Sequence, residues 1–158
     1  MKLQTWKPKG LMSKPWRRSW ACVELIKASE GYRERAFPDY HGRYQCGWGH
    51  TNGVEPDTTC DLTKAELWLS TDLDKCDAAL NAKVTVKLTQ GMVDALDDWI
   101  YNLGVGEFAS APGLALLNKG DYQAAWRHFY SYIYAGGHKS PGLMHRREEE
   151  RQLFFSAV

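Results

Sequence analysis

The stretch SEGYRERAFPDYHGRYQCGWGHT, residues 29–51, sets a glutamate at the end of an apolar stripe and an aspartate nine residues later in a turn. The stripe has spacings of three and four, which predict a helix over residues 16–30 with one face turned inward. Its members are Trp20, Val23, Ile26 and Glu30. Gly31 follows as a stop signal, so the glutamate is expected at the inward edge of a helix terminus.

The second half of the stretch predicts a small antiparallel hairpin or meander. Pro38-Asp39 and His41-Gly42 are typical of turns, and residues 43–48 alternate in the manner of a strand. Residues 51–61 contain further turn dipeptides and predict a loop.

The rest of the chain predicts helices. Thr63 and Glu66 have the spacing of a capping box, which begins a helix that runs to about residue 82. Its predicted buried stripe is Ala65, Trp68, Leu69, Cys76 and Leu80. Further helices are predicted over residues 89–103, 112–118, 121–134 and 143–155, with a flexible connector at 135–142.

These elements predict a mainly helical α+β fold with two lobes and a cleft between them. The expected parts are a basic leader at 1–15 and a single catalytic domain at 16–158, which consists of a small β lobe at about 31–61, an interlobe helix at about 63–82 and a helical lobe at about 83–158. A chain of 158 residues is long enough to form one such core without disulfides.

Composition and charge exclude several classes of protein. The net charge of +1 gives no field suited to nucleic acid. The basic leader carries no acid; a solvated tail is the expected reading, and contact with an anionic surface is the alternative. It lacks the apolar region of a signal peptide, and no membrane-spanning segment is predicted, so synthesis in the cytoplasm is expected.

The four cysteines are Cys22, Cys46, Cys60 and Cys76. They have no metal-ligand spacing, and free thiols are the expected state, with a bridge between Cys60 and Cys76 as an alternative in an oxidising compartment. No metal and no cofactor are expected.

Glu30 and Asp39 are the strongest candidates for chemistry. Cleavage of a glycosidic bond needs one carboxyl that holds a proton and a second that stays ionised. Partial burial at the edge of an apolar stripe is expected to raise the pKa of Glu30, whereas Asp39 in a polar turn is expected to stay charged.

The string from Glu30-Gly31 through Pro38-Asp39 to Gly47-Trp48-Gly49-His50-Thr51 resembles the active-site region of phage-type lysozymes, the endolysins of glycoside hydrolase family 24. Later segments also resemble that family, so that the likeness covers residues 17–155. These segments are LTKAELWLSTDLDKCDAAL, NLGVGEF and AGGHKSPGLMHRREEER.

The resemblance implies hydrolysis of the β-1,4 bond between N-acetylmuramic acid and N-acetylglucosamine in bacterial peptidoglycan. It implies that Glu30 is the general acid and that Asp39 holds or activates the attacking water, with an inverting outcome. Gln45 stands where the family usually has a threonine that orients this water; its amide can also accept and donate hydrogen bonds.

The resemblance implies further roles outside the hairpin. Phe108, Ser110 and Arg146 are implied on the substrate side, and Arg146 is expected to pair with Glu30 or to support its helix. His50 and Asp72 are implied as a structural ion pair between the hairpin and the interlobe helix.

Two other readings of the same residues stay open. A lytic transglycosylase also uses a single glutamate, and a catalytically silent cell-wall-binding module would keep the fold alone. As an endolysin, the protein is expected to be a monomer without stable membrane insertion. It would reach peptidoglycan from the host cytoplasm after a holin-like protein permeabilises the membrane, although a secreted muramidase effector would have the same sequence features.

Overall fold

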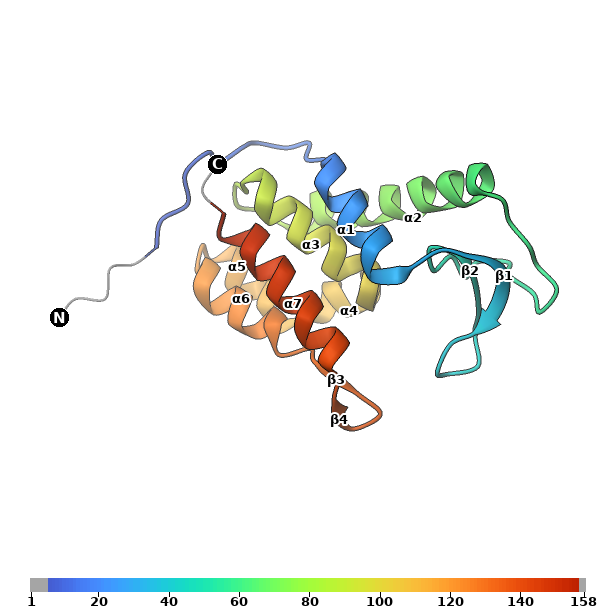
Figure 1. Ribbon diagram of the computed structural model, residues 1–158. Coiled ribbons are helices and arrows are strands. Elements are labelled where there is room, and N and C mark those ends of the chain that lie inside the picture. The colour runs from blue at the N-terminus through green and yellow to red at the C-terminus, as the bar shows by residue number, and fades with distance from the viewer. Residues whose placement is uncertain (1–5, 157–158) are drawn as a thin grey trace.

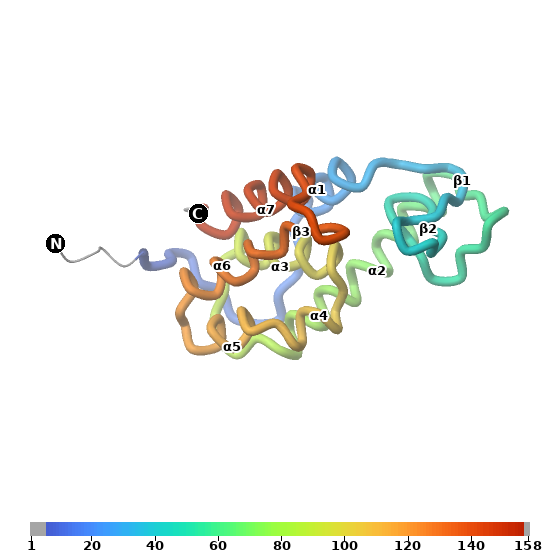
Figure 2. Tube along the Cα trace, turned by 90° about the horizontal axis from the view of Figure 1, so that it is seen from below, coloured from blue at the N-terminus to red at the C-terminus, as the bar shows by residue number. Residues whose placement is uncertain are grey.

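The computed structural model describes residues 6–156, and within them it shows seven helices and two small antiparallel sheets. In chain order the elements are α1 (Trp20–Glu30), β1 (Arg33–Pro38), β2 (Tyr44–Gly47), α2 (Leu62–Lys83), α3 (Gln90–Leu103), α4 (Val105–Ser110), α5 (Pro112–Asn118), α6 (Tyr122–Tyr130), β3 (Tyr134–Ala135), β4 (His138–Lys139) and α7 (Pro141–Phe154). Figures 1 and 2 place β1 and β2 in a small lobe at one end, connected through α1 and α2 to a helical lobe. The predicted mainly helical α+β fold is confirmed.

The helical lobe is built around α3, which packs against α7, α2 and α1. Every residue of α3 from Gly91 to Ile100 is buried. Gly91 is required by the approach of α7, because a Cβ there would lie 2.2 Å from the carbonyl oxygen of Leu153. Large rings fill the space on the other side of α3, and Trp99 contacts the rings of Phe108 and Phe129.

The first helix is shorter than predicted. It begins at Trp20 rather than at residue 16, and Trp20 is 72% exposed, so its place in the predicted buried stripe was wrong. The segment before it runs extended because its backbone N–H groups find partners in other helices. Those of Arg18 and Ser19 donate to the carboxylates of Asp77 and Asp94, at 3.0 and 2.8 Å.

The predicted start of the interlobe helix was wrong by two residues. The N-cap of α2 is Asp61, whose carboxylate accepts the backbone N–H of Lys64 at 2.8 Å, and Thr63 lies inside the first turn. Trp68 is only half-buried, while Leu73 and Asp77 join the buried face.

The later helices follow the predictions with three exceptions, one of which is the start of the last helix, at Pro141 rather than at residue 143. The helix expected over residues 121–134 ends at Tyr130, and the expected flexible connector instead contains the hairpin of β3 and β4. The short helix α4 was not predicted, because two of its six residues, Gly106 and Ser110, are poor helix formers.

The described part of the N-terminal segment packs against the helical lobe at Trp6 and Met12, while its lysines Lys7, Lys9 and Lys14 are exposed, as expected for a solvated basic run. The ring of Trp6 packs edge-on against Phe155, with centroids 4.9 Å apart, and the N–H of Met12 donates to the carbonyl of Leu88 at 2.7 Å. The prediction for residues 1–5 falls outside the described residues.

A buried acid lies between α2 and α3. Asp97 is fully buried, and neither of its carboxylate oxygens has a donor among the described residues. Burial, followed by its contact with the Asp77 carboxylate, raises the pKa of Asp97 to about 9, an effect that Arg18 opposes and Asp94 reinforces. A pKa raised in this way favours the neutral carboxyl of Asp97 at pH 7.

We expect Asp97→Asn to weaken the pH dependence of stability. The folded protein keeps this proton between about pH 4 and 9 whereas the unfolded chain loses it, so Asp97 makes stability fall as the pH rises through that range. Chemical denaturation measures the free energy of unfolding at pH 5 and at pH 8.5. Its decrease between these two pH values should be smaller in Asp97→Asn than in wild type by an amount on the order of a few kcal/mol. The control is Asp57→Asn, because Asp57 is exposed. If the free energy of unfolding fell by the same amount between the two pH values in both variants, Asp97 would not be the group that holds the proton.

Candidate active site

Glu30 is the last residue of α1, and Gly31 follows it with φ of +70°, a backbone conformation that favours glycine. The carboxylate is partly accessible, with 21% of its side chain exposed. Its Oε1 accepts a hydrogen bond from Nη1 of Arg146 on α7 at 2.7 Å. The predicted pairing of Arg146 with Glu30 is therefore present in the structure.

Arg146 is held in turn by Asp98 on α3. Its Nε and Nη2 donate to the two oxygens of this carboxylate at 3.0 and 2.7 Å, and both side chains are buried. Burial alone would raise the pKa of Asp98, but the charge and hydrogen bonds of Arg146 outweigh it and hold that pKa below its ordinary value. The guanidinium is thus fixed between one buried carboxylate and one half-exposed carboxylate.

A second arginine and a glutamate extend this network along α7. Arg147 Nη2 donates to Glu150 Oε1 at 2.5 Å and to the side-chain oxygen of Asn102 at 2.9 Å. Burial and a hydrogen bond with Asp98 raise the pKa of Glu150 well above its ordinary value, which favours a neutral carboxyl. The network accounts for the burial of Arg146, whereas Nε and Nη1 of Arg147 have no hydrogen-bond partner among the described residues.

Gly49 brings the small lobe against the catalytic glutamate candidate. Its φ is +93°, and a Cβ built on it would lie 3.3 Å from Glu30 Oε2 and 3.6 Å from Gln45 Oε1. Glu30 Oε2 and the Gln45 amide oxygen therefore border the same small space. The two oxygens of Glu30 thus have different surroundings: Oε2 faces the hairpin, and Oε1 faces Arg146.

We expect Gly49→Ala to reduce activity more than Gly53→Ala, a matched control. Both glycines have positive φ, so each substitution should cost about 1–2 kcal/mol in backbone strain. A Cβ at position 53 meets no atom within 4 Å, whereas one at position 49 would lie 3.3 Å from Glu30 Oε2 and push that oxygen aside by a few tenths of an ångström. Denaturation and turnover of both variants test this; equal activity per folded molecule would contradict a role for Gly49 beside Glu30.

Asp39 is fixed by the hairpin turn that it begins. Its Oδ1 accepts the backbone N–H groups of His41 and Arg43 at 2.8 and 2.9 Å, and Nε of Arg43 donates to Oδ2 at 3.2 Å. The Arg43 N–H, ahead of that of His41, holds the pKa of Asp39 below its ordinary value. Asp39 is accordingly ionised near neutrality, as its position in a polar turn predicted.

The hairpin register places Asp39 beside Gln45. Gln45 of β2 lies opposite Phe37 of β1, and the ladder continues past Pro38, since the N–H of Asp39 donates to the carbonyl of Arg43 at 2.8 Å. Residues two apart on a strand point to the same face, and diagonal cross-strand neighbours are within reach of each other. The register therefore puts Gln45 and Asp39 on the same face of the hairpin, and the Gln45 amide oxygen lies near Gly49, as does Glu30 Oε2.

The two lobes also meet at two further contacts. Tyr40 follows Asp39 in the turn and is 85% exposed, yet its hydroxyl lies 3.1 Å from the position of a Cβ on Gly136, between β3 and β4. On the inner side, the hydroxyl of Tyr101 on α3 donates to the carbonyl of Trp48 at 2.6 Å. Both contacts join the β hairpin to the helical lobe.

One of the three residues implied on the substrate side is not placed as expected. Phe108 is fully buried and stacks within the core near Trp99 and Phe129, so its predicted contact with substrate was wrong. Phe108 lies on the buried side of α4, and the prediction failed because this helix was not expected from the sequence. Ser110 is exposed at the end of α4, and its hydroxyl donates to backbone carbonyls of its own helix.

His50 and Asp72 form the expected contact. Nδ1 of the buried imidazole lies 2.6 Å from Asp72 Oδ2, and Nε2 lies 2.9 Å from the carbonyl oxygen of Asn52. The ring stacks on Trp68 with centroids 4.5 Å apart. The hairpin is thereby attached to α2, at a place with no contact to Glu30.

We expect Asp72→Asn to lower stability by about 1–3 kcal/mol, since the buried imidazole loses its charged partner. Turnover at a temperature where the variant is folded should stay within a factor of about three, as the residue acts only through the fold. Lys75→Ala is the control, because it removes the other partner of Asp72, a half-exposed pair at 3.0 Å. Lost turnover in a fully folded Asp72→Asn would show a catalytic role instead.

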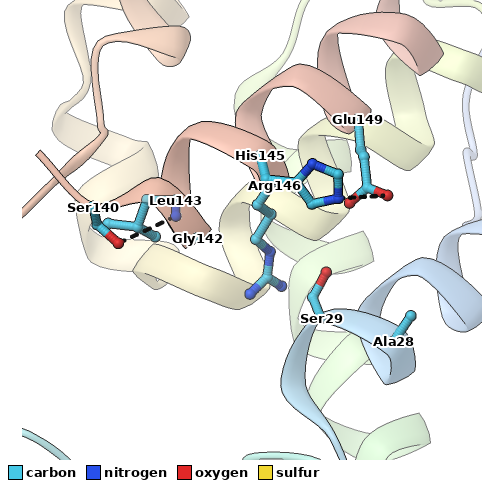
Figure 3. A pocket seen from close by; sticks show the side chains of 8 residues that line it. All are labelled: Ala28, Ser29, Ser140, Gly142, Leu143, His145, Arg146 and Glu149. Carbon is cyan, nitrogen blue, oxygen red and sulfur yellow. Dashed lines mark hydrogen bonds and ion pairs between the residues drawn. The ribbon is translucent and has the colours of Figure 1, made fainter.

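A hollow of about 430 Å³ opens between the end of α1 and α7 (Figure 3). Ala28 and Ser29 line it from α1, and His145, Arg146 and Glu149 line it from α7. Figure 3 shows the guanidinium of Arg146 extending from α7 toward the end of α1. The residue that holds Glu30 therefore also borders open space.

The sequence alone did not identify Asp98 as part of this site, and it placed Gly49 in the motif without showing that it lies against Glu30. A signal for Asp98 existed in DALDDWI, residues 94–100, where three aspartates interrupt a helix that is otherwise apolar. Buried charges need partners, and the adjacent arginines 146 and 147 were available. No group of three or more possible metal ligands occurs within residues 6–156.

A partly exposed glutamate at the end of α1, a polar amide near it and an ionised aspartate in the hairpin turn, on a two-lobed fold, define a lysozyme-like glycoside hydrolase. The phage lysozyme family model matches residues 27–150. The chain belongs to the phage lysozyme family, as its sequence predicted.

Individual relatives agree with this assignment. The chain is 36% identical over 137 residues to the endolysin of Acyrthosiphon pisum secondary endosymbiont phage 1, a match that covers 84% of this chain and 94% of that protein. It is 37% identical over 140 residues to the endolysin of Salmonella phage P22, with 85% and 94% covered. The solved muramidase domain of SpmX from Asticaccaulis excentricus has a TM-score of 0.81 at 30% identity, with 89% and 98% covered.

Proposed function

We propose that this protein is an endolysin muramidase that hydrolyses the β-1,4 bond between N-acetylmuramic acid and N-acetylglucosamine. The observation that carries the proposal is the orientation of Glu30: Arg146 occupies Oε1, and Oε2 faces Gly49 and Gln45. A carboxyl held in this way has one defined oxygen from which a proton can be donated.

In the proposed reaction, Glu30 is the general acid and Asp39 is the general base. Glu30 donates the proton on Oε2 to the glycosidic oxygen as its bond to the anomeric carbon breaks. Asp39, ionised and held by the turn, accepts a proton from the attacking water, which the Gln45 amide helps to orient. Because water attacks from the face opposite the leaving sugar, the product is expected to have inverted configuration.

Product analysis separates this mechanism from its nearest rival. Purified peptidoglycan is digested, and the new reducing ends are followed by NMR from the first minutes. An α-anomer that appears first and then mutarotates supports inversion. A β-anomer would refute the inverting mechanism, and a 1,6-anhydro product would show a lytic transglycosylase. Unchanged glycan under conditions in which another muramidase cuts it would indicate a silent cell-wall-binding module.

We also propose a route to the substrate, supported by the endolysin names of the relatives. The protein, a monomer whose catalytic domain is residues 16–158, would accumulate in the host cytoplasm and act after a holin-like protein permeabilises the membrane. No helix of the described residues is both long and apolar enough to span a membrane. Expression with and without a pore-forming protein tests the route: lysis without it would contradict dependence on such a partner.

A further inference from the structure

Two cysteines of the small lobe lie in contact. The Sγ atoms of Cys46 and Cys60 are 3.1 Å apart, and both residues are buried. Cys46 belongs to β2, next to Gln45, whereas Cys60 comes from the end of the loop that follows. The pair therefore joins the strand that carries a site residue to the segment that enters α2.

The backbone holds both cysteines in place. The N–H of Cys60 donates to the carbonyl of Glu34 and the N–H of Cys46 to that of His50, each at 2.9 Å. Both sulfurs also lie near the carbonyl oxygen of Arg33, at 3.5 and 3.6 Å. Two thiols whose backbones are fixed in this way, one in β2 and one at the end of the following loop, need only a small movement to reach each other.

The other two cysteines are located elsewhere. Cys22 contacts the carbonyl of Asp94 in the helical lobe, and Cys76 contacts that of Asp72 within its own helix. The neighbour of Cys60 is thus Cys46, and not Cys76, the pairing considered from the sequence.

We propose that Cys46 and Cys60 are a disulfide-forming pair that is oxidised when the chain meets a disulfide oxidant of the glutathione disulfide class. The thiolate of one cysteine attacks a sulfur of the oxidant, and one thiol of the oxidant leaves. The second cysteine then attacks the mixed disulfide, which releases the other thiol of the oxidant. Two protein thiols are oxidised and one oxidant disulfide is reduced, and the two protein sulfurs close from 3.1 Å to about 2 Å.

The bond would close a loop that contains Gly49 and His50, so it would hold together the backbone that lies against Glu30. Burial, and then the contact with Cys46, raise the pKa of Cys60 to about 11, which makes the thiolate scarce in the folded protein. Oxidation is therefore expected during folding or local opening of residues 51–61, and slowly otherwise.

Peptide mapping tests the pair directly. The full chain is refolded in a glutathione redox buffer, which gives every thiol access to the oxidant, and is then alkylated and digested with trypsin. Residues 44–64 contain both cysteines and no internal lysine or arginine, so a single peptide reports the bond. We expect the 44–64 peptide to carry no alkyl group and to be lighter by two hydrogen atoms than the reduced peptide. The peptides that contain Cys22 (19–27) and Cys76 (76–83) should be alkylated.

Thermal unfolding supplies a second readout, which does not depend on catalysis. Oxidised wild type should melt roughly 5–10 °C above its reduced form, because the cross-link restricts the unfolded chain. Cys60→Ser should lose this difference, and Cys76→Ser, the control, should keep it. Two alkylated thiols in the 44–64 peptide after oxidative refolding, or a cross-link from it to the 76–83 peptide, would overturn the proposal.

Discussion

Replacement of Glu30 by glutamine is expected to reduce the turnover of peptidoglycan by about 10²–10⁴-fold, the usual contribution of a positioned general acid. The amide keeps the size of the carboxyl, and its oxygen can still accept the hydrogen bond from Arg146. The fold should therefore survive, and the loss should appear in kcat. Release of reducing sugar from purified peptidoglycan, together with the melting temperature, measures both effects.

The matched control is Glu24→Gln, on the same helix. Glu24 is exposed, and its contact is a surface pair with Lys27 at 3.8 Å, so the change should leave turnover unaltered. If folded Glu30→Gln kept more than about a tenth of the wild-type rate, a general acid at this position would be excluded.

Arg146→Met is expected to cause the largest loss of stability, about 3–5 kcal/mol, since it leaves the buried charge of Asp98 without its partner. For a chain of this size that loss lowers the melting temperature by roughly 10 °C. Glu30 also loses the donor that fixes Oε1, so turnover at low temperature should fall by about 10-fold or more. Chemical denaturation and kinetics below the transition measure the two effects separately.

Arg151→Met is the control for this experiment. Arg151 lies on the same helix and pairs with Glu148 at 2.7 Å, but both side chains are largely in contact with solvent. An exposed pair contributes about 0–1 kcal/mol, so this variant should be close to wild type. Equal losses in Arg146→Met and Arg151→Met would show that the buried network does not support the fold as argued.

Much of the architecture was predictable because it depends on local patterns. Apolar spacing and caps placed α3 within one residue, with Thr89 as its N-cap and Gly104 at its end. The same reasoning failed at residues 16–19, where a helical pattern is overridden by carboxylates of α2 and α3 that bind the backbone. Tertiary donors and acceptors of this kind leave no periodic signal in the sequence.

The sequence by itself determined the two-lobe fold, the family and the candidates Glu30 and Asp39, because turn chemistry, helix termini and a short motif are local in the chain. Only the tertiary structure decided which groups surround them. Asp98 and Arg146 are distant in sequence but share a buried contact, and Phe108 is turned into the core by a helix too short to be foreseen. Long-range packing sets these partners, and the cost of burying an unpaired charge makes the choice specific.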